Sequence, residues 1–202
     1  MKTFCAFFLL SHLAAAAQPS PRPKVAIVPL GTVEASTLEA VKTTLENGLP
    51  VDATILAPLP LPDSARLPLP GRYGVLSLLA YLEENLPSDY RKVVGVTSVD
   101  ITLPNDRSPY WGVFGGSWLS RAPAVISTSR LRGPSHNRTP RDVRAGRVAI
   151  LELGHTLGVQ HCSSPRCLME AASGSIRPVD QEDQGFCSTC RQKLLAALSA
   201  LP

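Results

Sequence analysis

Several features that would place this 202-residue chain in common protein classes are missing from it. No segment repeats, which excludes solenoid and propeller arrays and leaves one compact domain as the expected organisation. After Ala17, no apolar run approaches the roughly 20 residues that span a bilayer, so no stable membrane anchor is expected. The formal net charge is only +4, and strong nucleic-acid binding is therefore not indicated.

The N-terminal segment has the pattern of a secretory signal. Lys2 precedes an apolar run over residues 4–13, and small residues follow as far as Ala17, where cleavage is expected. The run is too short to span a bilayer, which favours cleavage over an uncleaved anchor. We therefore expect an exported protein, either periplasmic or secreted. Its expected organisation is a signal peptide at 1–17, a proline-rich arm at 18–23 and one folded domain at 24–202.

The apolar pattern predicts strands that alternate with helices. Runs of apolar and β-branched residues predict strands, and apolar residues spaced three or four positions apart predict helices. The proline-rich stretch at 58–70 is predicted to be a loop. Such alternation predicts an α/β or α+β sandwich. The expected strands are 24–29, 51–57, 91–101, 110–115 and 124–127, and the expected helices are 36–49, 74–86 and 140–157.

The helix expected at 140–157 has a start signal and carries a row of arginines. Thr139 can cap it, Pro140 suits its first position, and Asp142 completes a pattern similar to a capping box. Arginines at every third position form a slowly rotating stripe on the helix surface. We expect this stripe to be exposed to solvent, with recognition of anionic substrates as the alternative. Its members are Arg138, Arg141, Arg144 and Arg147.

The end of the same helix is similar to the metal-binding helix of zinc peptidases. In an H-E-x-x-H helix, two histidines four residues apart bind zinc, and the glutamate beside the first accepts a proton from metal-bound water. Glu152 stands at the position of this base and His155 at that of the second ligand, but Leu151 replaces the first histidine. Gly158 permits a left-handed turn, and His161 needs that turn to return to the same metal.

Four cysteines follow at defined spacings. After H-C come four residues, then C-L-M, then seventeen residues, then C-S-T-C. This order resembles the signature of the archaemetzincin family of zinc metallopeptidases, from which only Leu151 departs. The resemblance implies a metzincin-like mixed sheet, an active-site helix, a C-terminal zinc-cysteine subdomain, and a methionine turn at Met169 beneath the catalytic metal. It also implies a structural zinc ion held by Cys162, Cys167, Cys187 and Cys190.

The state of these cysteines has two alternatives. An exported protein with an even number of cysteines would ordinarily form disulfides. Pairs separated by four and by two residues are more typical of zinc sites, and we favour structural zinc. Cys187 and Cys190 also match a redox-active C-x-x-C pair, although no thioredoxin-like context surrounds them.

The catalytic zinc is the main functional question. Loss of one ligand in four is expected to weaken zinc binding by about two decades. Three groups could replace it, namely Glu152, the distant His136 or a second water, and we favour the water. The leucine could also fill the cavity and close it. We therefore favour a pseudopeptidase that binds peptides or protein partners and in which His155 and His161 form a weakened zinc site, with a zinc-dependent peptidase as the alternative.

Overall fold

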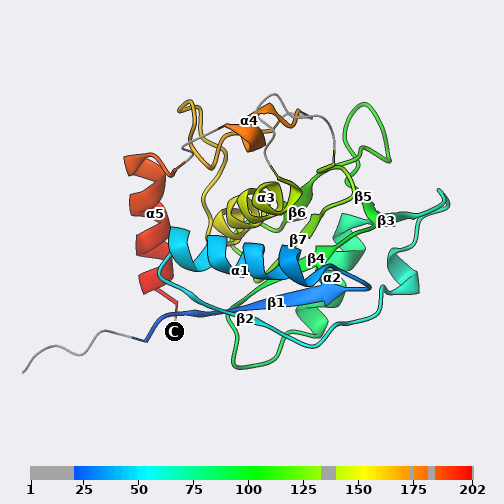
Figure 1. Ribbon diagram of the computed structural model, residues 1–202, viewed down its shortest axis with the longest axis horizontal. Coiled ribbons are helices and arrows are strands. Elements are labelled where there is room, and N and C mark those ends of the chain that lie inside the picture. Colours follow the sequence, from blue (N-terminus) through cyan, green and yellow to red (C-terminus); the bar gives the residue numbers. More distant parts are fainter. Residues whose placement is uncertain (1–20, 133–139, 173–174, 182–184, 202) are drawn as a thin grey trace, which may run out of the picture.

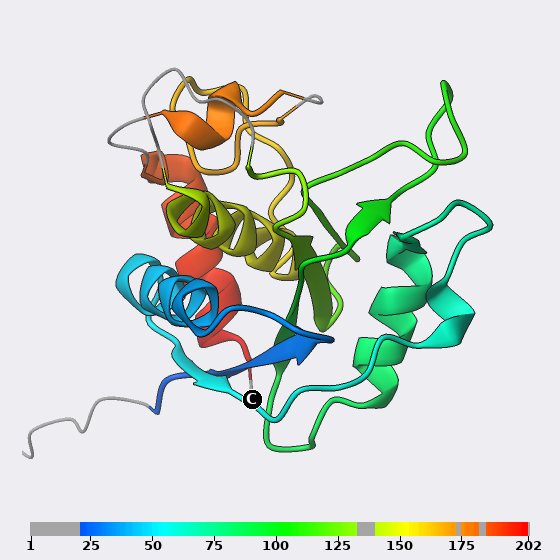
Figure 2. The same ribbon diagram turned by 45° about the vertical axis from the view of Figure 1, so that its right-hand side comes forward.

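An open β-sheet between two layers of helices forms the centre of the computed structural model (Figure 1). The structure describes residues 21–132, 140–172, 175–181 and 185–201. Figure 2 shows the strands between the two helical layers. This mixed architecture agrees with the α/β or α+β sandwich that the sequence predicts.

The strands form one large sheet and one small sheet. The large sheet has the order β2-β1-β4-β7-β6, and the small sheet pairs β3 with β5. All neighbours in the large sheet are parallel except β6, which pairs antiparallel with β7 and forms an edge. The bounds are Lys24–Leu30 (β1), Asp52–Ile55 (β2), Arg72–Gly74 (β3), Lys92–Thr97 (β4), Asp100–Thr102 (β5), Gly115–Ser117 (β6) and Pro123–Ser127 (β7).

Both faces of the large sheet are covered, which explains its continuous apolar strands. Successive residues of a strand point to opposite faces. In β1, Val25 and Ile27 therefore pack into one core, and Ala26 and Val28 pack into the other. The first core lies under α1 (Ala35–Gly48), α3 (Arg141–Thr156) and α5 (Ser188–Ser199), and the second lies under α2 (Val75–Glu84). A short helix, α4 (Arg177–Asp180), lies beside α3.

The strands and the proline-rich loop differ from the predictions in four places, the first of which is that β3 was not predicted. The strand expected at 91–101 is two strands, because a turn after β4 sends β5 to the small sheet. The strand expected at 110–115 lies later in the chain, because β6 begins at Gly115, the last residue of the predicted range. The loop expected at 58–70 contains one turn of 3-10 helix at Asp63–Ala65. These segments lie next to turns, where local pattern is the weakest guide to strand pairing.

The start of α3 is close to its prediction. Pro140 precedes the helix, and Arg141 is its first residue, one position later than expected. The carboxylate of Asp142 accepts a hydrogen bond from the hydroxyl of Thr37 (2.7 Å), which joins α3 to α1. Thr139, the predicted cap, lies outside the described residues. The structure therefore gives Asp142 a role in joining helices that its local pattern did not indicate.

The prediction that the arginine stripe of α3 is exposed to solvent is wrong. Arg144 is only 2% exposed, and its guanidinium donates to both carboxylate oxygens of Asp180 (2.6 and 2.8 Å). Arg141 pairs with Glu34, and Arg147 donates to a backbone carbonyl of α4. Steps of three residues rotate the stripe by about 60° each, so it passes from solvent into the interface with α4.

Several predictions fall on segments outside the described residues. These are the signal peptide at 1–17, the first part of the proline-rich arm, and His136 and Arg138. They stay predictions.

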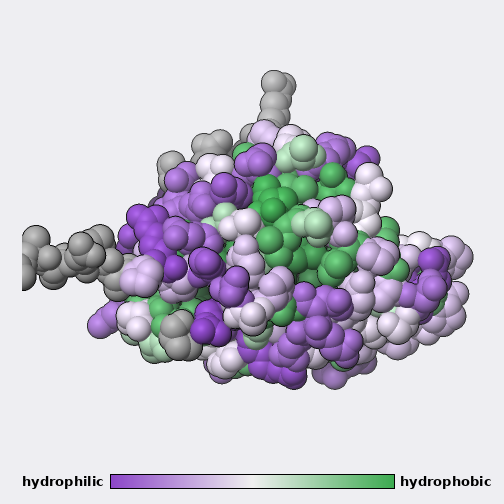
Figure 3. Space-filling model, turned by 90° about the horizontal axis from the view of Figure 1, so that it is seen from below, coloured by the Kyte–Doolittle hydropathy of each residue, from purple (hydrophilic) through white to green (hydrophobic). Residues whose placement is uncertain are grey.

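No helix within the described ranges is long and apolar enough to cross a membrane. On the face seen in Figure 3, apolar residues gather into a patch with polar residues around it.

Candidate active-site cleft and metal centres

A cleft of about 980 Å3 opens along α3. Three residues at four-residue intervals lie on one face of this helix, namely Arg147, Leu151 and His155. All three line the cleft. The edge strand β6 lines the cleft as well, together with Leu168, Glu170, Ile176 and Val179. Leu151 both lines this cleft and packs against the first hydrophobic core, so the expectation that the leucine fills part of the metal cavity stays a prediction.

Glu152 lies at the inner wall of the cleft. It is 8% exposed, and one carboxylate oxygen accepts a hydrogen bond from the hydroxyl of Ser117 on β6 (2.7 Å). Burial raises the pKa of Glu152 to about 7, although the Ser117 hydrogen bond acts in the opposite direction. A Cβ atom at Gly115 would lie 2.8 Å from Cγ of Glu152, so glycine is needed where this side chain crosses β6. Glu152 can therefore take up or release a proton near neutral pH.

His155 and His161 come together at the end of α3, as the sequence predicts. Gly158 has a φ of +85°, the left-handed conformation expected of the turn that ends the helix. Nδ1 of His155 lies 2.7 Å from the carbonyl oxygen of Val159, which assigns the proton to Nδ1 and leaves Nε2 with a lone pair. Nε2 of His155 lies 3.2 Å from Nε2 of His161. Burial lowers the pKa of both imidazoles, which favours their neutral, metal-binding form.

The two imidazoles are spaced to supply two nitrogen ligands to one metal ion. Two nitrogen ligands of a tetrahedral zinc ion lie about 3.3 Å apart, close to the 3.2 Å between these Nε2 atoms. Within the described residues, however, no third His, Cys, Asp or Glu side chain joins His155 and His161 to form a possible metal site. Glu152 is thus not placed as the replacement ligand. The same 3.2 Å separation also suits a hydrogen bond between the two rings.

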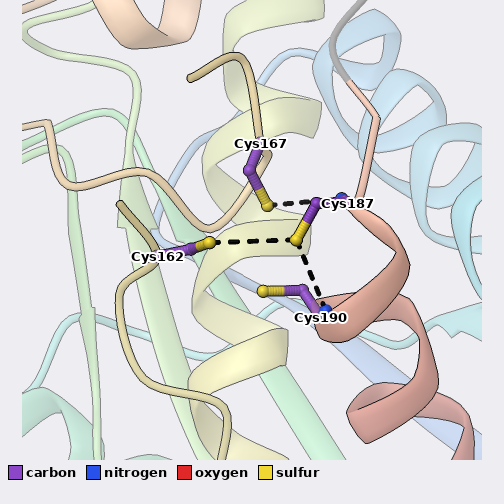
Figure 4. A group of neighbouring side chains, drawn as sticks. All are labelled: Cys162, Cys167, Cys187 and Cys190. Atoms are coloured by element: carbon purple, nitrogen blue, oxygen red, sulfur yellow. Dashed lines mark hydrogen bonds between the residues drawn. The ribbon is translucent and has the colours of Figure 1, made fainter. Parts of the chain in front are cut away.

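The four cysteines form a second cluster beside the end of α3 (Figure 4). Their sulfur atoms all lie within 4.8 Å of one another, and all four thiols are free in this structure. Sγ of Cys162 lies 3.8 Å from Sγ of Cys187, which matches the roughly 3.8 Å edge of a tetrahedral zinc-thiolate site. Free, convergent thiols favour the predicted zinc site over disulfides and over an isolated redox pair.

Backbone groups support the cysteine cluster. The N–H groups of Ser164, Cys187 and Cys190 lie 3.4 to 3.5 Å from the sulfurs of Cys162, Cys167 and Cys187 respectively. The N–H of Cys190 is the main group that lowers the pKa of Cys187, to about 6, whereas burial raises the pKa of Cys190. Such donors stabilise thiolates, the form that zinc binds.

Met169, the residue of the predicted methionine turn, packs against α3. It is fully buried, and a Cβ atom at Gly154 would lie 2.6 Å from its sulfur. Gly154 immediately precedes His155, so the methionine packs against the turn of helix that carries this histidine. Its backbone carbonyl accepts a hydrogen bond from the N–H of Cys162 (2.8 Å). Met169 therefore connects the histidine pair to the cysteine cluster.

Sequence reasoning missed Ser117 and the backbone carbonyl of Val159. Ser117 reaches Glu152 across 35 positions in the chain, and no local pattern shows such a contact. The one available signal was the pair Gly115 and Gly116, because adjacent glycines in a strand indicate close approach by another group.

Comparison with known proteins assigns a family to this arrangement. A family model described as peptidase family M54 matches residues 72–196. The chain is 30% identical to an archaemetzincin of Natronomonas pharaonis over 178 residues, which are 85% of this chain and 99% of that protein. The crystal structure of an archaemetzincin from Methanopyrus kandleri matches with a TM-score of 0.75 and 26% identity, covering 91% of this chain and 99% of that one.

A second crystal structure supports the same assignment. The archaemetzincin of Archaeoglobus fulgidus, solved in complex with malonate, matches with a TM-score of 0.68 and 28% identity, covering 84% of this chain and 99% of that one. The family match spans α3, both histidines and all four cysteines. The chain therefore belongs to peptidase family M54, the archaemetzincin family of zinc metallopeptidases.

Proposed function

We propose that this chain is an archaemetzincin-family protein that binds peptides, keeps a structural zinc site and has a degenerate catalytic zinc site. The observation that carries the proposal is the place of Leu151 on the cleft face of α3, one turn before His155. The family pattern requires a zinc ligand at this place, and a leucine side chain has no donor atom. The absence of a third ligand beside His155 and His161 within the described residues supports the same conclusion.

The cleft suits an extended peptide. Among the described strands, β6 pairs only with β7, so its outer edge can form backbone hydrogen bonds with an added strand. Many of the residues that line the cleft are apolar, among them Trp111, Phe114 and Val179, and these can receive side chains of the ligand. Membership in a peptidase family supports a peptide as the bound molecule.

A weak peptidase is the second candidate, and the environment of Glu152 favours it. When bound, zinc would polarise a peptide carbonyl and lower the pKa of a water molecule to about 7. One oxygen of Glu152 accepts the Ser117 hydrogen bond, which leaves the other oxygen to take up a proton. A carboxyl with a pKa of about 7 is suited to proton transfer at neutral pH.

A cleavage assay separates the two functions. The purified full chain is incubated with a quenched-fluorescent peptide library, with and without added zinc, beside the variant Glu152→Ala. The binding function predicts no cleavage above that of the variant. Cleavage by the wild type that a chelator abolishes and Glu152→Ala removes would instead establish the peptidase.

A further inference from the structure

Arg147 is placed to bind a charged group of the peptide. It lines the cleft one helical turn from Leu151 and two turns from His155. At 1.5 Å rise per residue, these steps are about 6 Å and about 12 Å along α3. An extended peptide covers about 12 Å with three to four residues. A peptide residue bound at Arg147 would therefore lie three to four residues along the peptide from the residue bound beside His155.

Arg147 differs from the other arginines of α3 in its partners. The guanidinium of Arg141 pairs with Glu34, and that of Arg144 pairs with Asp180. Arg147 is half-buried, and its Nη1 donates to the carbonyl oxygen of Val179 at 2.8 Å. Within the described residues it has no carboxylate within 4.0 Å.

Two of the three acidic residues that line the cleft have hydrogen-bond donors other than Arg147. Glu152 accepts from Ser117, and Glu170 accepts from the N–H of Arg166 (3.1 Å) and from Gln181 (3.4 Å). Asp106 is exposed, on a loop that also lines the cleft. The described carboxylates of the cleft therefore leave the positive charge of Arg147 without an ion pair.

We propose that Arg147 binds a carboxylate of the peptide ligand, at a subsite separate from the histidine pair. A guanidinium presents several N–H donors in a planar fork that matches a carboxylate. The apolar neighbours Val148, Leu151 and Val179 also line the cleft, and they keep water away and so strengthen the ion pair. The ligand class is a peptide with an apolar residue next to a carboxylate, which an acidic side chain or a free C-terminus can supply. This inference rests on the proposed peptide-binding function.

Fluorescence anisotropy with four labelled octapeptides tests the proposal. The peptides consist of alanine and leucine, carry either one Asp or the matched Asn, and end in either a free or an amidated C-terminus. The wild-type full chain is expected to bind a peptide with a carboxylate about tenfold more tightly than the uncharged peptide. Comparing the Asp and free C-terminus arms identifies the source of the carboxylate.

Variants of Arg147 separate two roles of its side chain, namely binding of the ligand's carboxylate and the hydrogen bond that holds α4 in place. In Arg147→Gln the preference for the carboxylate should fall below about twofold, whereas Arg147→Lys should keep part of it. Arg141→Gln, on the same helix but outside this cleft, is the matched control and should keep the full preference. Added salt should weaken binding of the charged peptide more than that of the neutral one.

The contrary outcomes are distinct. Equal binding of all four peptides by the wild type would overturn the role of Arg147 and leave the peptide-binding function in place. An equal loss of affinity for charged and neutral peptides in Arg147→Gln would also overturn it, since that pattern belongs to support of α4 alone. No binding of any peptide by the wild type would overturn both proposals.

Discussion

The substitution Leu151→His should restore a third zinc ligand to the cleft. Residue 151 lies on the same face of α3 as His155, four positions earlier, and its side chain reaches the cleft. Structural zinc binds with roughly 12 kcal/mol over four ligands, or about 3 kcal/mol for each. One added ligand should therefore strengthen zinc binding at the histidine pair by about two decades. Zinc titration in competition with a chromogenic chelator measures this change.

Two controls make the zinc titration decisive. Leu151→Gln introduces a polar side chain of similar size that is a poor zinc ligand, so its zinc affinity should stay within about threefold of the wild type. The double variant Leu151→His with His161→Ala adds one ligand and removes another, so its zinc affinity should not exceed that of the wild type. An unchanged affinity in Leu151→His, with the fold intact by circular dichroism, would refute the assignment of residue 151 as the missing ligand position.

Three further predictions concern stability and the cysteines. Asp180→Asn leaves the charge of Arg144 buried without its partner and should lower the free energy of unfolding by about 3 to 5 kcal/mol in urea titrations, whereas exposed Asp63→Asn should change it by less than about 1 kcal/mol. Burial raises the pKa of Glu152 from 4.5 to about 7. The free energy of unfolding of the wild type relative to Glu152→Gln should therefore be greatest below pH 4.5 and should fall by on the order of 3 kcal/mol as the pH rises through 7. A difference that does not change with pH would contradict the burial of this carboxyl. Cys190→Ser should abolish structural zinc and reduce the helical signal of α5 in circular dichroism, and full retention of zinc would contradict the four-cysteine site.

The sequence predicted the parts of the fold that depend on local pattern. The strands β1, β2 and β7 and the helices α1, α2 and α3 were predicted to within a few residues, because their burial imposes a period on the sequence. The helices α4 and α5 were not predicted. Helix α4 has only four residues. Helix α5 begins inside the C-x-x-C motif, directly after Cys187, and these cysteines were interpreted as zinc ligands and not as the start of a helix.

The site was predictable where its chemistry depends on spacing. The histidines and cysteines occupy fixed positions in a motif, so the sequence indicated which of them would converge. Contacts between distant segments were not predictable. Arg144 was assigned to solvent because its partner Asp180 is 36 positions away, and Ser117 was missed for a similar reason. Local pattern shows which helix face a side chain occupies, but not what packs against it.

Metal analysis of the purified wild-type protein by mass spectrometry, after dialysis against metal-free buffer, tests the central claim most directly. The proposed function predicts that the four-cysteine cluster keeps its ion and that the histidine pair loses it, so one zinc ion per chain is expected. Two tightly bound zinc ions would show that the cleft has a complete catalytic site despite Leu151. A zinc-free, folded protein would contradict the structural role of the cysteines.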